Sequence, residues 1–223
     1  MPLAVLLAAL DHRDRTGDGQ YIDFSQAEAC VHLLAPAILD YSINGREFER
    51  IGNADAQIAP HAVYPAAGDD RWVAIATPSE EQCRALAGAI GRTDLADAHP
   101  DLASRQAHLD AIDAAIGSWT SEREMFDVQD ELQAAGVPAH AVQNSAEAVL
   151  DPQLQHRGHF VTLEHDTVGT TTVEGSRFRL SRTPAQIGRA APSFGRDNFQ
   201  VLTELLGYDA ERVAELAAAA ILE

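Results

Sequence analysis

Apolar residues recur at helical spacing in the first part of the chain, and short alternating runs follow further along. Over the first 45 residues the pattern predicts a helix, a strand and a second helix, at 3–13, 21–24 and 25–44. Ser25-x-x-Glu28 is typical of a capping box that opens the second helix, and Pro36 predicts a kink within it. The first helix is expected to end at Gly17 and Gly19, and the second at Asn44-Gly45. Helix, strand and helix in succession indicate an α/β fold.

Beyond residue 45 the pattern predicts two β-hairpins. The first alternates at Val73 and Ile75 and turns at 68–70, where Gly and Asp tolerate unusual backbone angles. The second covers 159–175, and a short strand precedes it at 137–142. All of these strands are short, so the sheets they form are expected to be small.

Helical spacing returns around these strands. Helical segments are expected at 80–90, 101–119, 121–135, 145–158, 198–206 and 209–219. The third of them begins with Ser121-x-x-Glu124, another predicted capping box. Residues 182–197 are expected to form a loop. The apolar residues at 46–61 also follow neither helical nor strand spacing. A stretch as long as 46–61 without structure is either a linker or functional.

The composition narrows the kind of partner. The chain has 223 residues, of which 46% are apolar and 22% charged, as in a packed globular protein. Its formal net charge of -18 argues against a nucleic-acid partner and against an anionic membrane surface. A few local arginines can still bind a phosphorylated small molecule. The net charge therefore argues against nucleic-acid and membrane partners, but not against small ligands.

The cysteines and the start of the chain bear on location. Cys30 and Cys83 form no CxxC pair, so neither a zinc knuckle nor a redox pair is indicated. A reducing, cytoplasmic location is the expectation. The apolar run at 2–10 is too short to span a bilayer.

The usual catalytic motifs do not occur. No GxSxG, Walker or GxGxxG sequence is present. The closest histidines, His156, His159 and His165, lack the fixed convergence that a metal ion needs, so no metal site is predicted. Asp69 and Asp70 are explained by the hairpin turn.

The irregular segment before the first hairpin is the best candidate for function. It combines small residues such as Gly52 and Ala54 with polar Asn53, Gln57 and His61. It is either a linker between subdomains or a lid that faces a ligand, and the sequence pattern leaves both open.

Several long motifs resemble one family. AALDHRDRTGDGQYIDFSQAEA, RIGNADAQIAPHAVYPAAGDDRWVAIAT and FRLSRTPAQIGRAAPSFGRDN are similar, in this order, to the class III CoA-transferases. That family includes formyl-CoA transferase, carnitine CoA-transferase and α-methylacyl-CoA racemase. The resemblance implies a Rossmann-like large domain built from both chain ends, a smaller inserted domain, and two interlocked subunits.

The resemblance also implies how this chain is divided. Family members are roughly twice as long, a size that fits two domains, so the chain is expected to be their C-terminal half. The expected parts are a large-domain segment at 1–45, a linker or substrate loop at 46–62, a small α+β domain at 63–144, and a return segment with C-terminal helices at 145–223.

The chemistry that the resemblance implies is CoA transfer from an acyl-CoA to a carboxylic acid through an aspartyl intermediate. The nucleophilic aspartate is expected upstream of this chain, so no catalytic residue and no activity without the first half are expected here. CoA is a substrate, and neither a permanently bound cofactor nor a metal is expected.

One substrate-contacting element is expected in this half. In formyl-CoA transferases a glycine-rich loop ending in Gly-Gly-Gln follows a GNA sequence and closes over the intermediate. Here Gly52-Asn53-Ala54 is followed by Asp55-Ala56-Gln57, so the loop is shorter and has lost its glycines. The substrate-binding residues implied are Asn53, Asp55, Ala56 and Gln57, with Gln57 offering its amide to a carboxylate.

Three alternatives remain open. Racemases of the family have a glutamate after the hairpin tyrosine, where this chain has Tyr64-Pro65, which favours a transferase over a racemase. A non-catalytic remnant that binds a partner is the second alternative, and an unrelated enzyme is the third. An apolar helix face predicts an oligomer, either an interlocked homodimer or a pair with the missing half; its residues are Leu3, Leu6, Leu7 and Leu10.

Overall fold

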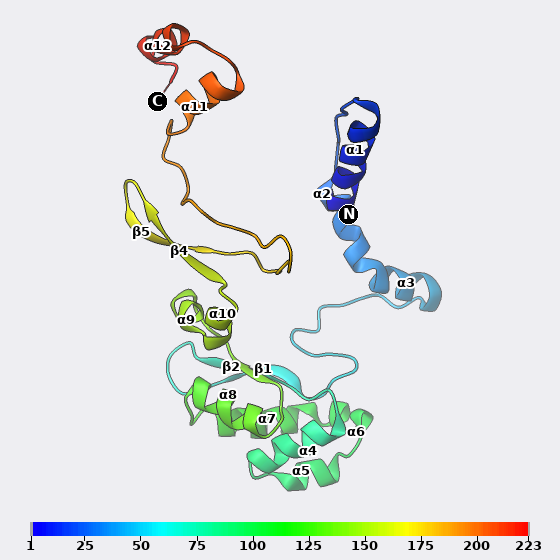
Figure 1. Cartoon of the computed structure of the whole chain (residues 1–223). Helices are drawn as coiled ribbons and strands as arrows, with labels where there is room; N and C mark the ends of the chain where they lie inside the picture. Colours follow the sequence, from blue (N-terminus) through cyan, green and yellow to red (C-terminus); the bar gives the residue numbers. More distant parts are fainter. Residues whose placement is uncertain (1, 223) are drawn as a thin grey trace. The chain divides into compact units, whose positions relative to one another are not determined.

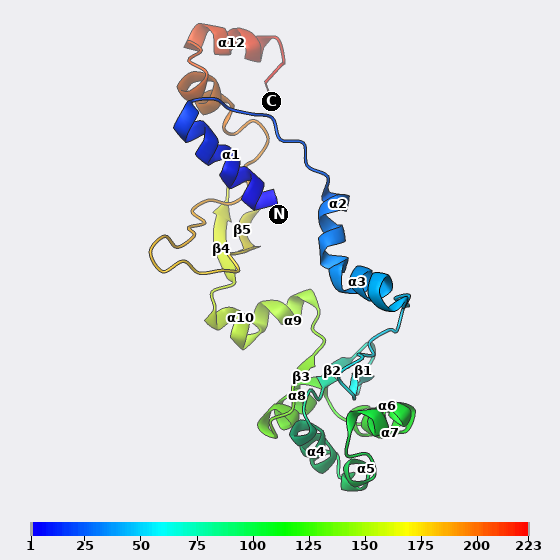
Figure 2. The ribbon, with the colours of Figure 1, turned by 90° about the vertical axis from the view of Figure 1, so that its right-hand side faces the viewer.

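The computed structural model describes residues 2–222 (Figures 1 and 2). The chain divides into two compact units, the first reaching to His140 and the second beginning at Ala141. Helices and short strands alternate in both, so the chain is mixed α/β as predicted. None of the helices among the described residues is both long enough and apolar enough to cross a membrane.

Three helical pieces open the first unit: α1 (Pro2–Thr16), α2 (Gln26–Val31) and α3 (Ala35–Asn44). Gly17 ends α1 at a φ of 81°, and Gly45 ends α3 in the left-handed region, so both predicted stops are confirmed. A 3₁₀ turn, His32–Leu34, interrupts the predicted second helix just before Pro36. Proline has no N–H to donate and crowds the preceding turn, which accounts for the break.

The strand predicted at 21–24 does not form, and these residues have no regular structure. A strand is stable only when a neighbour pairs with its backbone groups, and no described segment pairs here. Ser25 does accept a hydrogen bond from the Glu28 N–H, at 3.3 Å, and so caps α2. The four leucines that predicted an uncovered face on α1 are exposed by 36–67%.

The first predicted hairpin is confirmed. β1 (His61–Pro65) pairs antiparallel with β2 (Trp72–Ala76), and β3 (Ala139–Ala141) lies beside β2. The turn has two residues with positive φ, Gly68 at 109° and Asp70 at 51°. The pairing aligns His61 with Ala76 and Tyr64 with Val73.

Five helices follow β2: α4 (Glu80–Ala89), α5 (Thr93–Ala98), α6 (Leu102–Ala107), α7 (Leu109–Thr120) and α8 (Met125–Ala134). Figures 1 and 2 show α4, α7 and α8 on one side of the sheet. The core lies between them, where every member is at most 2% exposed: Val73, Ile75, Leu86, Ile116, Met125, Val128 and Leu132.

Two helix predictions in this region are wrong. The helix predicted at 101–119 is split into α6 and α7 at His108, whose φ of -122° lies outside the helical region. Ser121 opens no capping box, because its N–H donates to the Gly117 carbonyl and it closes α7 instead. α8 then begins after Glu124. α5 was not predicted at all.

The second unit starts with α9 (Ser145–Leu150) and α10 (Pro152–His156), capped by Asn144 and Asp151. The second predicted hairpin is confirmed as β4 (Phe160–His165) paired with β5 (Gly169–Glu174). Residues 176–197 contain neither helix nor strand, which confirms the loop predicted at 182–197. The unit ends with α11 (Asn198–Gln200), a π-helical turn (Val201–Leu205) and α12 (Ala210–Ala218). The four-part division of the chain stays a prediction.

Candidate functional site

The segment between α3 and β1 has a defined shape without regular structure. It turns at Gly52, whose φ is 64°, and the Ala54 N–H donates to the Ile51 carbonyl at 3.2 Å. The Asp55 carboxylate then accepts the Gln57 N–H at 2.7 Å. Short polar side chains that bond to the backbone two residues on are typical of turns, so two successive turns shape the loop.

Side chains from outside the loop hold its carbonyl groups. His61 Nδ1 lies 2.5 Å from the Asn53 oxygen, and Gln106 Nε2 donates to the Ala56 oxygen at 3.0 Å. Arg105, only 5% exposed, donates through Nε to the Ala59 oxygen at 2.8 Å. The loop is therefore fastened at every third carbonyl, from β1 and from α6.

The four predicted substrate-contacting residues, Asn53, Asp55, Ala56 and Gln57, all lie in this loop and are exposed. Asp55 and Ala56 contribute to its shape through the hydrogen bonds just described. The side-chain amide of Gln57 has no hydrogen-bond partner among residues 2–222, so it is available to a ligand. Contact between these residues and a substrate stays a prediction.

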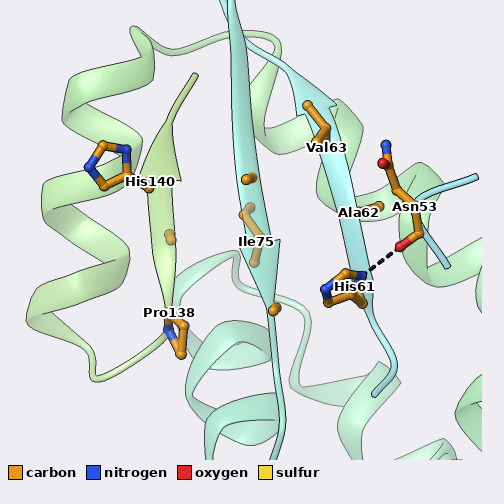
Figure 3. A pocket seen from close by; sticks show the side chains of 10 residues that line it. Asn53, His61, Ala62, Val63, Ile75, Pro138 and His140 are labelled. Carbon is orange, nitrogen blue, oxygen red and sulfur yellow. Dashed lines mark hydrogen bonds between the residues drawn. The ribbon is translucent and has the colours of Figure 1, made fainter. Parts of the chain in front are cut away.

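A hollow of about 370 Å³ lies beside this loop, on the face of the sheet opposite the helices (Figure 3). Its lining is mainly alanine, valine and isoleucine from the three strands. Asn53, His61 and His140 contribute the polar side chains. Such a mostly apolar concavity with a few polar groups is the usual form of a small-molecule site.

The strand register decides which side chains face the hollow. Residues directly opposite each other in a pair share a face, so His61 and Ala76 lie on the same side as Val63 and Ala74. On β3, His140 is exposed between two buried alanines, and it therefore points to the face opposite theirs. The sequence alone did not indicate that His61 and His140 line one hollow.

A partly buried pair supports the site from the helix side of the sheet. Tyr64, 3% exposed, donates its hydroxyl hydrogen bond to Asp113 Oδ1 at 2.6 Å and so links β1 to α7. Burial raises the pKa of Asp113 above its ordinary value, although the Tyr64 hydrogen bond acts in the opposite direction. Burial, followed by the bond to Asp113, raises the pKa of the Tyr64 phenol far above its usual value.

The histidines of the second unit have other surroundings. His156 ends α10, and His165 Nδ1 accepts the Thr167 N–H at 3.1 Å beside the β4–β5 turn. Within residues 2–222 no three histidine, cysteine, aspartate or glutamate side chains come together as a metal site would require.

Comparison with known proteins gives a family match. The model of CoA-transferase family III matches residues 1–198. The chain is 34% identical over 213 residues to a probable CoA-transferase, Rv1866, of Mycobacterium tuberculosis, covering 94% of this chain and 26% of that protein.

Three further relatives, which belong to two enzymes, are named for their substrates. A succinyl-CoA–D-citramalate CoA-transferase of Chloroflexus aurantiacus is 30% identical, with 97% of this chain and 54% of that protein aligned. The alpha and beta subunits of a succinyl-CoA–L-malate CoA-transferase of that species are 29% and 30% identical, and the alignments cover 48% and 53% of the two subunits. In these last three alignments the chain spans about half of its relative's length.

Among solved structures, a CAIB/BAIF family protein from Brucella suis superposes with a TM-score of 0.78 at 25% identity. The superposition covers 91% of this chain and 52% of that one. The shared fold is therefore that of about half of the larger protein.

Proposed function

The chain belongs to CoA-transferase family III, and from that membership we propose that it forms the substrate-facing part of an enzyme that moves CoA from an acyl-CoA to a carboxylic acid. The observation that carries the proposal is the loop at 51–59, which is held against a small apolar hollow within the part of the chain that matches the family.

The proposed chemistry divides the exchange into simpler covalent steps. A carboxylate of an aspartate, on polypeptide outside these 223 residues, attacks the acyl-CoA thioester, and CoA leaves as its thiolate. The thiolate then attacks the aspartyl carbonyl, so that an aspartyl-CoA thioester forms and the first acid leaves as a carboxylate. The acceptor carboxylate next attacks the aspartyl carbonyl of this thioester and displaces CoA thiolate, so that an anhydride between the acceptor and the aspartate forms. The thiolate then attacks the acceptor's carbonyl in this anhydride, which gives the acceptor-CoA thioester and frees the aspartate.

The loop's role in this scheme is to orient a carboxyl group. Gln57 donates an amide hydrogen bond to it, and Asn53, Asp55 and Ala56 keep the loop in position. Because His61, Gln106 and Arg105 hold the loop carbonyls, the loop is organised before substrate binds. Such preorganisation reduces the entropic penalty of binding, because the loop does not have to be ordered when substrate binds.

The names of the relatives indicate the class of acid. Citramalate, malate and the succinyl group each derive from a dicarboxylic acid. We therefore extend the proposal to short dicarboxylic acids. A four-carbon acid is small compared with a hollow of about 370 Å³.

A second polypeptide completes the proposed enzyme. The exposed leucines of α1 form an apolar face of the kind that marks an interface. Relatives include two subunits of one enzyme, alpha and beta. The partner is either another copy, as in an interlocked homodimer, or a separate chain that carries the aspartate.

The test starts with native mass spectrometry of the untagged protein from its own cells. A complex with a second chain that carries the aspartate is expected, and this complex should transfer CoA from succinyl-CoA to L-malate. Gln57→Ala should lower kcat/KM by roughly tenfold, because it removes a hydrogen bond to a charged group. Gln153→Ala, an exposed glutamine on α10, is the matched control.

Two results would refute the proposal. One is CoA transfer by the chain alone with no second polypeptide present. The other is an isolated complex that gives no transfer under any reconstitution, which would favour a non-catalytic, partner-binding remnant. Exchange of an α-proton without CoA transfer would instead indicate the racemase alternative.

A further inference from the structure

His61 has one ring nitrogen in use and one unused. Nδ1 lies 2.5 Å from the Asn53 carbonyl oxygen, and a carbonyl oxygen can only accept a hydrogen bond. Nδ1 therefore carries a proton and donates it. No hydrogen bond within residues 2–222 involves Nε2. In the neutral ring Nε2 is then an acceptor with a lone pair, and in the charged ring it is a second donor.

The unused nitrogen faces the hollow. Figure 3 shows the His61 ring beside β1, with the dashed bond to Asn53 on one side and the other ring nitrogen directed over the sheet toward β2. The floor below it is made of small side chains on the same face, Ala76 opposite His61 and Ala74 opposite Val63. Beside Asn53 and His140, the hollow thus offers the Nε2 of His61, oriented over a short apolar floor.

A carboxyl group fits this arrangement better than the alternatives. A phosphate group is usually held by arginine, lysine or several backbone N–H groups, and neither arginine nor lysine lines the hollow. A metal ion needs three or four converging ligands, which the described residues do not bring together. A carboxyl group needs only one hydrogen bond to Nε2, with the proton on either the carboxyl oxygen or the nitrogen. The carbon chain of the acid can then lie on the alanines.

We propose that the hollow on the open face of the β1–β2–β3 sheet binds the carboxyl group of the acceptor acid, and that His61 Nε2 is the group that holds it. This inference rests on the proposed function and names the site of its acid substrate. The proton shared between oxygen and Nε2 comes from the solvent or from the acid itself.

The same ring then connects the acid to the loop. When Nε2 shares a proton with a carboxylate, the imidazole gains positive charge, and its Nδ1–H becomes a stronger donor to the Asn53 carbonyl. Acid binding should therefore tighten the loop that carries Gln57. His61 acts here both as a ligand-binding residue and as a positioning residue for the loop.

The first test follows the ring itself. In the full chain labelled with ¹⁵N-histidine, the side-chain spectrum without ligand should show His61 protonated at Nδ1. Succinate, the probe, should bind with a Kd in the millimolar range, as one or two polar contacts allow, and should shift the Nε2 resonance toward its protonated position. Succinamide has the same carbon skeleton without carboxylates and should cause no shift.

Two substitutions separate the two roles of the ring. His61→Asn keeps a donor near the position of Nδ1 and has no atom at Nε2, so it should weaken succinate binding by about tenfold while the loop exchanges its amide hydrogens at the normal rate. His61→Gln places an amide near Nε2 and removes the loop contact, so it should speed exchange over 51–57 and retain more of the succinate affinity. Backbone amide spectra report binding and folding for both variants.

Three outcomes would overturn the inference. They are unchanged succinate affinity in His61→Asn, no shift of His61 at saturating succinate, and equal shifts at His12 and His156, which would indicate adventitious anion binding only. The site and the proposed function fail separately. Binding at His61 without CoA transfer in the complex would refute the function alone, and transfer without binding at His61 would refute the site alone.

Discussion

Two parts of this chain have similar side chains and very different burial. In the sheet-and-helix region from β1 to β3, Leu132 and Ile116 are completely buried. In α1 to α3, Leu7 is 56% exposed and Leu33 is 80% exposed. Apolar content is therefore not what makes a region fold on itself. The first region has a sheet against which its helices pack, whereas α1 to α3 lack a partner surface among the described residues.

The largest expected difference between the two regions is in the stability lost when a leucine is replaced by alanine. Leu132→Ala should lower the free energy of unfolding by about 2–5 kcal/mol, because it removes buried methyl groups and leaves a cavity. Leu7→Ala makes the same chemical change at an exposed position and should cost under about 0.5 kcal/mol in the isolated chain. Urea denaturation of both variants measures the difference, and equal costs would show that α1 is packed in solution.

The second pair tests a buried hydroxyl. Tyr64→Phe removes the donor to Asp113 and should destabilise the sheet region by about 1–2 kcal/mol. Tyr41→Phe, on α3 and 60% exposed, should have almost no effect. Thermal unfolding followed by circular dichroism would compare them. A large effect at Tyr41 would contradict the assignment of α3 to the uncovered region.

The third pair compares helix caps. Ser79 closes a full capping box with Gln82 at the start of α4, and Ser79→Ala should cost about 1 kcal/mol. Ser25→Ala removes the cap of α2, which has no buried residue, so the same change should leave the main unfolding transition in place and reduce helix content locally. A shared shift of the main transition would mean that α2 folds together with the core.

Asp113 gives the packed region a dependence on pH. Its pKa is raised in the folded state, chiefly by burial, so the folded state binds the proton more tightly than the unfolded state does. The contribution of this group to stability is present below the ordinary carboxyl range near pH 4 and is lost as pH rises through the raised pKa.

Asp113→Asn removes this pH-dependent contribution, so the variant should lose less stability than the unsubstituted chain as the pH rises above about 4. Urea denaturation at several pH values gives the comparison. Parallel stability profiles for the two proteins would contradict the raised pKa.

The smallest effect on global stability is expected for the hydrogen bond that joins α6 to the loop at 51–59. Gln106→Leu removes the bond to the Ala56 carbonyl and should leave global stability within about 0.5 kcal/mol. Hydrogen exchange over 51–57 should nevertheless become several times faster, because opening of the loop no longer breaks that bond. Gln26→Leu, on exposed α2, is the control. Unchanged exchange in Gln106→Leu would show that α6 does not hold the loop.

Local signals predicted most of the elements correctly. Both hairpins and the helix ends at Gly17 and Gly45 depend on turn chemistry and backbone limits within a few residues. Pro36 predicted a kink in one helix, whereas a 3₁₀ turn divides that helix into α2 and α3. The strand predicted at 21–24 was wrong because residue types alone cannot supply the neighbour that a strand needs. The capping box predicted at Ser121 was wrong. The spacing of Ser121 to Glu124 is typical of a helix start, but the Ser121 N–H bonds to α7 and ends that helix instead.

The sequence by itself determined the family, the order of the hairpins and the place of the candidate loop, since each of these depends on residues close together in the chain. Only the tertiary structure decided what holds the loop and what faces the hollow. Gln106 and Arg105 lie 50 and 46 residues from the carbonyls they bind. His61 and His140 line one hollow only because β1 and β3 lie in the same sheet as β2. Contacts between residues so far apart in the chain exist only once the chain has folded.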